Sequence, residues 1–145
     1  MLAHISIGSN LGDRHAIVLH AADEVCALSR LGRGRCSTPV ESDPWGYDST
    51  NRFVNIGVDI HTDLPPIALL HTLQEIERRT AGRFAPGTPN LHRNPDGSYR
   101  DRLIDIDLIT YGDISLSTPE LTLPHPRMME RPFVLGPMRE LGHNI

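Results

Sequence analysis

Two aspartates at alternate positions, Asp105 and Asp107, interrupt an otherwise apolar segment. In a β-strand, residues two apart lie on the same face of a sheet, about 6.6–6.8 Å from each other along the strand. Two carboxylates in apolar surroundings are unfavourable unless something neutralises them. Because Mg²⁺ typically binds one or two carboxylates together with substrate phosphates, the pair predicts a magnesium site. The alternative is a solvated edge strand whose charges prevent aggregation.

Arginines flank the segments around this pair. Arg102 precedes the two aspartates, and Arg83 precedes a Pro- and Gly-rich stretch at 85–98. All 14 residues counted as Lys or Arg are Arg, so a phosphate must meet Arg, His or backbone N–H groups. Metal-bound carboxylates with guanidinium groups beside them indicate phosphoryl transfer, in which both neutralise phosphate charge.

A second candidate site lies at Phe53 and Asn55, which share the more polar face of a predicted strand. An aromatic ring can stack on a flat heterocycle, while a carboxamide offers it both a donor and an acceptor. A half-buried Phe beside a strand-edge Asn explains these two residues equally well. Trp45, Gly46 and Phe133 could add further walls, but the sequence alone does not place them there.

The hydrophobic pattern predicts the elements that must position these residues. Apolar positions at 17, 21, 25 and 28, after a possible cap at Asp13, predict one helix, and a second is expected from about 63–65 to Thr80, ending at Gly82. Strands are expected at 2–7, 33–40, 53–60 and 103–111, a loop at 41–51, a lid-like loop at 85–98, and a short apolar element at 133–141. This order predicts an α+β sandwich of the ferredoxin-like type, with an antiparallel sheet, helices on one face and long flexible loops.

Composition narrows the class of protein. A chain of 145 residues is expected to form one domain spanning 1–145, and its formal net charge of −4 argues against nucleic acid as a partner. No apolar run is long enough to span a membrane. Cys26 and Cys36 are interpreted as buried, reduced thiols of a cytoplasmic protein, and the eight His are spaced singly, which predicts no zinc site.

Motifs along nearly the whole chain resemble one known family, the 6-hydroxymethyl-7,8-dihydropterin pyrophosphokinases. The matching segments are Ile7-Gly8-Ser9-Asn10-Leu11-Gly12, Pro44-Trp45-Gly46, Phe53-Val54-Asn55, Gln74-Glu75-Ile76-Glu77, Gly82-Arg83, Arg102-Leu103-Ile104-Asp105-Ile106-Asp107, Leu123-Pro124-His125-Pro126 and Arg131-Pro132-Phe133. The Arg-x-x-Asp-x-Asp element, combined with the Pro-His and the Arg-x-Phe that follow it, is the most specific part of the resemblance.

The resemblance implies a role for each matching residue. Asp105 and Asp107 are expected to bind two Mg²⁺ ions that bridge the phosphates of ATP, and Arg83 and Arg102 to act as catalytic arginines. The other implied contacts with ATP are made by Gln74, Glu77, Arg102, Thr122, His125 and Arg131. Contacts with the pterin are implied for Ser42, Trp45, Gly46, Phe53, Asn55, Tyr99 and Phe133, with the rings of Phe53 and Phe133 on either side of the bicyclic system.

The expected reaction is a step of folate biosynthesis, in which pyrophosphate passes from ATP to the pterin alcohol and AMP is released. Asp107 is a candidate general base, although the metal could instead activate the alcohol. Two alternatives stay open: a metal-dependent phosphotransferase or hydrolase acting on another substrate, and a sensor domain that binds a small ligand without catalysis. We expect a monomer with small-molecule substrates only.

Overall fold

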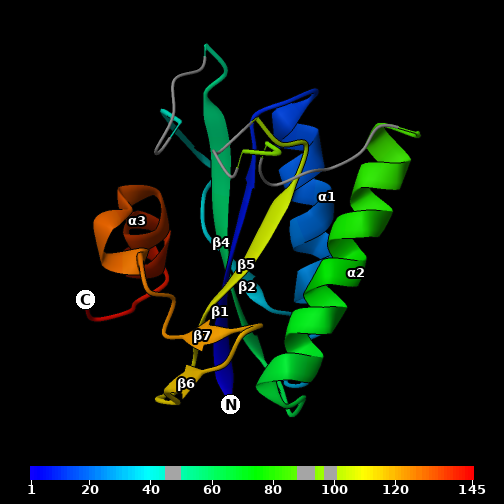
Figure 1. The fold of residues 1–145 in the computed structure, drawn as a ribbon. Helices are drawn as coiled ribbons and strands as arrows, with labels where there is room; N and C mark the ends of the chain where they lie inside the picture. Colours follow the sequence, from blue (N-terminus) through cyan, green and yellow to red (C-terminus); the bar gives the residue numbers. More distant parts are fainter. Residues whose placement is uncertain (45–49, 88–93, 97–100) are drawn as a thin grey trace.

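The computed structural model describes residues 1–44, 50–87, 94–96 and 101–145 (Figure 1). Its strands are β1 (Leu2–Ser9), β2 (Arg35–Cys36), β3 (Val40–Ser42), β4 (Phe53–His61), β5 (Asp105–Tyr111), β6 (Leu116–Ser117) and β7 (Thr122–Leu123). Its helices are α1 (Arg14–Cys26), α2 (Pro66–Phe84) and α3 (Pro132–Glu140), with a 3₁₀ turn at Met128–Glu130.

The main sheet is antiparallel and has β1 near its centre. β1 pairs with β4 on one side and with β5 on the other, and both β2 and β3 pair with β4. β6 and β7 form a separate pair. The strand order β2-β4-β1-β5 confirms the predicted α+β fold with an antiparallel sheet.

One face of the main sheet carries the larger hydrophobic core. Alternate residues of the strands, such as Ile5, Val58 and Leu108, are buried there against α1 and α2. Both helices lie on the same side of the sheet (Figure 1). Asp13 caps α1 by accepting a hydrogen bond from the N–H of Ala16 at 3.4 Å, as the sequence predicts. Burial of this apolar face fixes which strand residues point away from α1 and α2.

The predicted C-terminal apolar element is the helix α3, and it packs on the opposite face of the sheet (Figure 1). There Ile109 of β5 joins a second cluster with Val134, Leu135 and Met138. The prediction of helices on one face therefore holds for α1 and α2 only, because α3, expected only as an apolar element, covers the opposite face. Because α3 begins directly after Arg131, its packing brings the start of this helix over the face that carries the paired aspartates.

Several boundaries differ from the prediction. α2 continues through Gly82 to Phe84, because Ala81 is buried in the core and Phe84 packs against it, which offsets the cost of a glycine in the helix. The strand expected at 33–40 is two short strands separated at Pro39, which has no N–H for a ladder. β3 then extends into the segment expected to be a loop.

The expected lid at 85–98 lies largely outside the described residues, which include only 85–87 and 94–96 of it. Within the described part of the chain, no helix is both long enough and apolar enough to span a bilayer.

Candidate active site

Asp105 and Asp107 lie on the same face of β5, the face opposite to α1 and α2. In the pairing with β1, Asp105 is opposite Gly8 and Asp107 is opposite Ser6. The residue between the two aspartates, Ile106, is buried in the core on the other face. The alternation predicted from the sequence therefore does place the two carboxylates together.

The electrostatics of the pair are those of two carboxyl groups in contact. Burial raises the pKa of Asp107 well above its ordinary value, and the charge of Asp105 and a hydrogen bond with Asp105 raise it further. The charges of Arg102 and Arg131 act in the opposite direction. Two close carboxylates cannot both stay ionised without a compensating cation, so this pair is suited to hold one.

Basic side chains surround the carboxylates. A guanidinium nitrogen of Arg102 lies 2.7 Å from Oδ2 of Asp105, and both side chains are largely buried, with 12% and 16% exposed. Burial lowers the pKa of His125, as does the charge of Arg131, whereas the charge of Asp105 raises it. The charge of Arg131 therefore affects the pKa of both Asp107 and His125, and the charge of Asp105 affects the pKa of His125.

The second predicted site adjoins this cluster through Gly8. Gly8 is paired with Asp105 on one side and with Asn55 on the other. A Cβ at Gly8 would lie 3.1 Å from Oδ1 of Asn55 and 3.5 Å from the ring of Phe53, so the absence of a side chain makes room for both. Asn55 is 3% exposed, and its Nδ2 donates a hydrogen bond to Oγ of Ser42 at 2.8 Å. The structure thus brings Ser42, Phe53 and Asn55 together.

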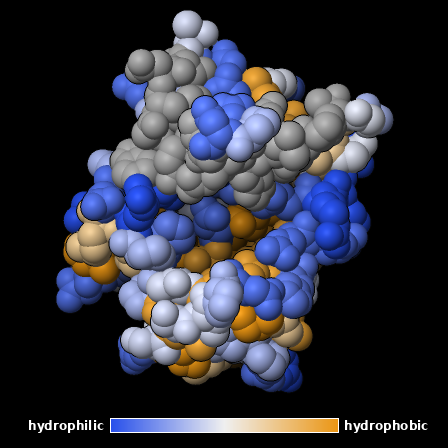
Figure 2. All heavy atoms as spheres, in the orientation of Figure 1, coloured by the Kyte–Doolittle hydropathy of each residue, from blue (hydrophilic) through white to orange (hydrophobic). Residues whose placement is uncertain are grey.

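Phe133, the other aromatic residue of the predicted pterin site, lies in the first turn of α3. It is half-buried against the cluster of Ile109 and α3, and the guanidinium of Arg131 lies over its ring, 5.8 Å from the ring centroid. In the view of Figure 2, the molecular surface is hollowed above the part that carries β6 and β7, and hydrophobic residues are visible inside the hollow.

Comparison with known proteins identifies the family of the chain. Residues 4–143 match the profile of the family described as 7,8-dihydro-6-hydroxymethylpterin-pyrophosphokinase. The chain belongs to this family. Its relatives include the 2-amino-4-hydroxy-6-hydroxymethyldihydropteridine pyrophosphokinases of Porphyromonas gingivalis and Bacillus subtilis. The first is 39% identical over 143 residues, which are 97% of this chain and 90% of the relative. The second is 33% identical over 144 residues, which are 99% and 80%.

A folic acid synthesis protein of Dictyostelium discoideum is 32% identical over an alignment of 147 positions, which covers 99% of this chain but 20% of that longer protein. The family assignment confirms the predicted enzyme class, a pyrophosphokinase of folate synthesis that uses ATP and a pterin.

The residues of this pyrophosphokinase for which contacts with ATP are implied differ in exposure and in hydrogen bonding. Gln74 is exposed on α2, while Glu77, one turn later, is 8% exposed and accepts a hydrogen bond from the N–H of Ile106 at 2.9 Å. Thr122 is exposed in β7. The N–H of His125 donates to the carbonyl oxygen of Ile109 at 2.8 Å, which fixes His125 beside β5.

Arg83 lies in the last turn of α2 rather than at the start of the loop. It is exposed, and its guanidinium is 5.8 Å from the ring centroid of Phe84. Three further predicted pterin contacts, Trp45, Gly46 and Tyr99, lie outside the described residues.

Asn10 was missed as a site residue by the sequence analysis, although it belongs to one of the matching motifs. It is 2% exposed, its Oδ1 accepts from the N–H of Arg102 at 2.7 Å, and its own N–H donates to the carbonyl oxygen of Arg102 at 3.0 Å. Its Nδ2 also donates to Asp101 at 2.8 Å. Asn10 is therefore a positioning residue for the arginine that pairs with Asp105. Its place in the matching motif, directly after the first predicted strand, was the signal in the sequence that could have identified it.

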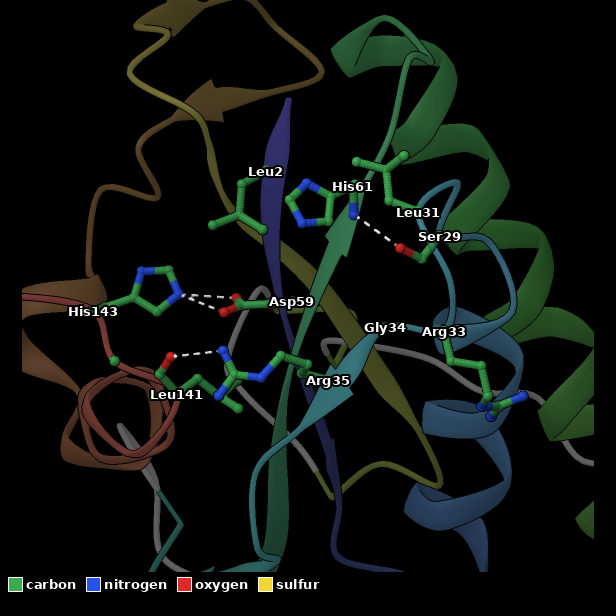
Figure 3. Close-up of a pocket in the computed structure, with 11 residues that line it drawn as sticks. Leu2, Ser29, Leu31, Arg33, Gly34, Arg35, Asp59, His61, Leu141 and His143 are labelled. Carbon is green, nitrogen blue, oxygen red and sulfur yellow. Dashed lines mark hydrogen bonds and ion pairs between the residues drawn. The ribbon is translucent and has the colours of Figure 1, made fainter.

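The expectation that the histidines are scattered was wrong for two of them. Nδ1 of His4 lies 2.8 Å from Oδ1 of Asp59, and Nε2 of His143 lies 2.9 Å from both oxygens of the same carboxylate. Figure 3 shows His143 from the C-terminal tail directed at Asp59 of β4. These three residues offer metal-ligating atoms within 4.8 Å of one another. Residues far apart in sequence meet here because His4 and Asp59 are directly opposed on β1 and β4.

Proposed function

We propose that Asp105 and Asp107 bind two Mg²⁺ ions together with the phosphates of ATP, and that the pterin binds beside them at Asn55. The observation that supports this most strongly is the shared row Asp105, Gly8 and Asn55 across the sheet. In this row, a single glycine separates the carboxylate pair, which can bind a cation, from a carboxamide that can hydrogen-bond a heterocycle.

The donor set fits magnesium. Carboxylate oxygens are ligands that Mg²⁺ accepts. The pKa of Asp107 is raised first by burial and then by the neighbouring carboxylate, and a bound cation would favour the ionised form against both effects. When bound, the metal supplies charge neutralisation on the phosphates and a template for their orientation.

The arginines and His125 complete the phosphate site in this proposal. Arg102 is held at its backbone by Asn10 and at its side chain by Asp105, so its guanidinium is already oriented when ATP arrives. Arg131 reaches the same cluster from the start of α3. Arg83, Gln74 and Thr122 are exposed and available to ATP from the surrounding elements. Such preorganised charges stabilise the charge that develops during phosphoryl transfer.

Glu77 contributes to the site through the backbone. Glu77 accepts a hydrogen bond from the N–H of Ile106, the residue between the two aspartates, and so holds β5 in place at this point. This contact gives Glu77 a positioning role, whether or not it also contacts ATP.

In the pterin site, Phe53 and Phe133 stack on the two faces of the ring system and Asn55 hydrogen-bonds its edge. Ser42, Trp45, Gly46 and Tyr99 complete this pocket in our proposal. The hydroxymethyl oxygen of the pterin then attacks the β-phosphorus of ATP, and AMP leaves. We further propose that the protein works as a monomer in the cytoplasm, with residues 1–145 as one pyrophosphokinase domain.

Product analysis tests this function. Incubation with Mg·ATP and 6-hydroxymethyl-7,8-dihydropterin should give AMP and the pterin diphosphate in equal amounts. Release of ADP would identify an ordinary kinase, and free phosphate would identify a hydrolase. Tight pterin binding without any turnover would identify a ligand sensor.

A further inference from the structure

Cys26 and Cys36 form a close thiol pair at the edge of the main sheet, away from the aspartate row. Cys26 is the last residue of α1, and Cys36 is in β2, which pairs with β4 only. Their sulfur atoms are 2.9 Å apart. A disulfide bond is about 2.05 Å long, so the sulfurs need to approach by only about 0.9 Å to bond.

The backbone around both cysteines holds the pair together. Gly34 donates a hydrogen bond to the carbonyl oxygen of Cys26 at 3.0 Å, and Cys36 is paired with Val58 of β4. A Cβ at Gly34 would lie 3.2 Å from Cα of Cys26 and 2.8 Å from the carbonyl oxygen of Asp59. Only glycine allows the chain before Cys36 to pass this close to the end of α1, so the proximity of the thiols is built into the packing.

The two thiols differ in access, contrary to the sequence-based expectation that both are buried. Cys36 is exposed, whereas Cys26 is 2% exposed. Burial, followed by the hydrogen bond to Cys36, raises the pKa of Cys26 to about 12. A reagent in solution therefore meets Cys36 first, and Cys26 can be reached only from within the pair.

We propose that this pair is a thiol modification site, at which Cys36 accepts a group from a low-molecular-mass disulfide such as glutathione disulfide and Cys26 then displaces that group. In the first exchange, the Cys36 thiolate attacks the external disulfide, forms a mixed disulfide and releases one thiol. In the second, Cys26 loses its proton, its thiolate attacks Sγ of Cys36, and the glutathione thiolate that leaves takes up a proton. Two protein thiols lose two protons and two electrons, and the external disulfide gains them.

The resulting Cys26–Cys36 bond would tie the end of α1 to β2 and close the loop between them. Residues of this loop, including Ser29, Leu31 and Arg33, line a cavity of about 280 Å³ beside Asp59 and His143 (Figure 3). Because a disulfide restricts the unfolded chain, the oxidised protein should have a higher Tm than the reduced protein.

Mass spectrometry tests the proposal. The reduced protein is incubated with glutathione disulfide, its remaining free thiols are blocked, and its mass is then measured. In the wild type, both free thiols should disappear and the mass should fall by two hydrogen atoms. No glutathionyl group should be retained. Cys26→Ser should retain one glutathionyl group on Cys36, and Cys36→Ser should stay unmodified under the same conditions. Circular dichroism before the reaction checks that each variant is folded, and Cys26→Ala and Cys36→Ala replace any variant that is not.

Three results would overturn the proposal. These are a stable glutathione adduct on the folded wild type, a disulfide between two chains through Cys36, and equal modification of Cys26→Ser and Cys36→Ser. Because the readout is protein mass and Tm, it is independent of the pyrophosphokinase activity.

Discussion

Asp105 and Asn55 occupy the two sides of Gly8 in a single row across β5, β1 and β4. Directly opposed residues on neighbouring strands have Cβ atoms about 4.5–5.5 Å apart. The carboxylate of Asp105 and the carboxamide of Asn55 are separated by two such spacings. The phosphate site and the pterin site are therefore set by the register of one sheet rather than by the folding of separate loops.

The first prediction concerns the glycine between these residues. In Gly8→Ala, the added methyl group would lie 3.1 Å from Oδ1 of Asn55, so the carboxamide must shift by a few tenths of an ångström, whereas 3.5 Å to the Phe53 ring is an ordinary contact. We expect the KM for the pterin to rise roughly tenfold, because small displacements of positioning groups are costly. Steady-state kinetics of AMP release measures this.

Gly136→Ala is the matched control, since a Cβ at that position of α3 meets nothing within 4 Å. Its kinetics should equal those of the wild type. An unchanged pterin KM in Gly8→Ala would contradict the proposed contact between Asn55 and the pterin.

The second prediction separates the two ligands. Asn55→Ala should weaken pterin binding by roughly tenfold to a hundredfold, the effect of losing buried hydrogen bonds, and leave Mg·ATP binding unchanged. Isothermal titration with each ligand measures both affinities.

Ser42→Ala separates the carboxamide from its support, because it removes the hydrogen bond that Nδ2 of Asn55 donates to Oγ of Ser42 but keeps the carboxamide. The substitution also keeps the backbone of residue 42, through which this residue is proposed to contact the pterin. We expect it to retain most of the pterin affinity. If both variants weaken the two ligands to the same extent, Asn55 supports the fold and does not read the pterin.

The third prediction concerns stability and pH. Burial by itself would raise the pKa of Asp59, but hydrogen bonds from His4 and His143 outweigh it and lower the pKa below its ordinary value. The ionised carboxylate is therefore favoured by folding, and its contribution is present above about pH 4 and is lost as the pH falls through the lowered pKa. Asp59→Asn should decrease the free energy of unfolding by about 1–3 kcal/mol at pH 7.

Urea unfolding at several pH values measures this difference, which should shrink as the pH falls below 4. Asp113→Asn, at an exposed position after β5, should change the stability by less than about 0.5 kcal/mol. A difference for Asp59→Asn that stays constant down to the lowest pH would mean that the carboxylate charge is not what the histidines stabilise.

The local sequence pattern was sufficient to predict which residues of β4 and β5 share a face at the candidate site. The alternation of apolar and polar residues in β4 and β5 fixes the face of Asn55, Asp105 and Asp107, because one face of each strand is buried against α1 and α2. The same reasoning could not predict the contacts of Asn10, which depend on backbone groups 92 residues away.

Contacts across long sequence separations account for what the sequence did not show. His4 and Asp59 are 55 residues apart, and they meet only because β1 and β4 pair in this register. Cys36 was expected to be buried, yet it is exposed because β2 lies at the sheet edge. The face chosen by α3 likewise depends on Ile109, whose apolar side chain shares a face with the aspartates.

The most direct test of the magnesium site is titration of a non-hydrolysable ATP analogue into the wild type, Asp105→Asn and Asp107→Asn, with and without Mg²⁺. The wild type should bind the analogue at least tenfold more tightly when Mg²⁺ is present, whereas neither variant should gain from the metal and both should bind the pterin like the wild type. Variants that keep the full magnesium effect would contradict the assignment of these two aspartates as metal ligands.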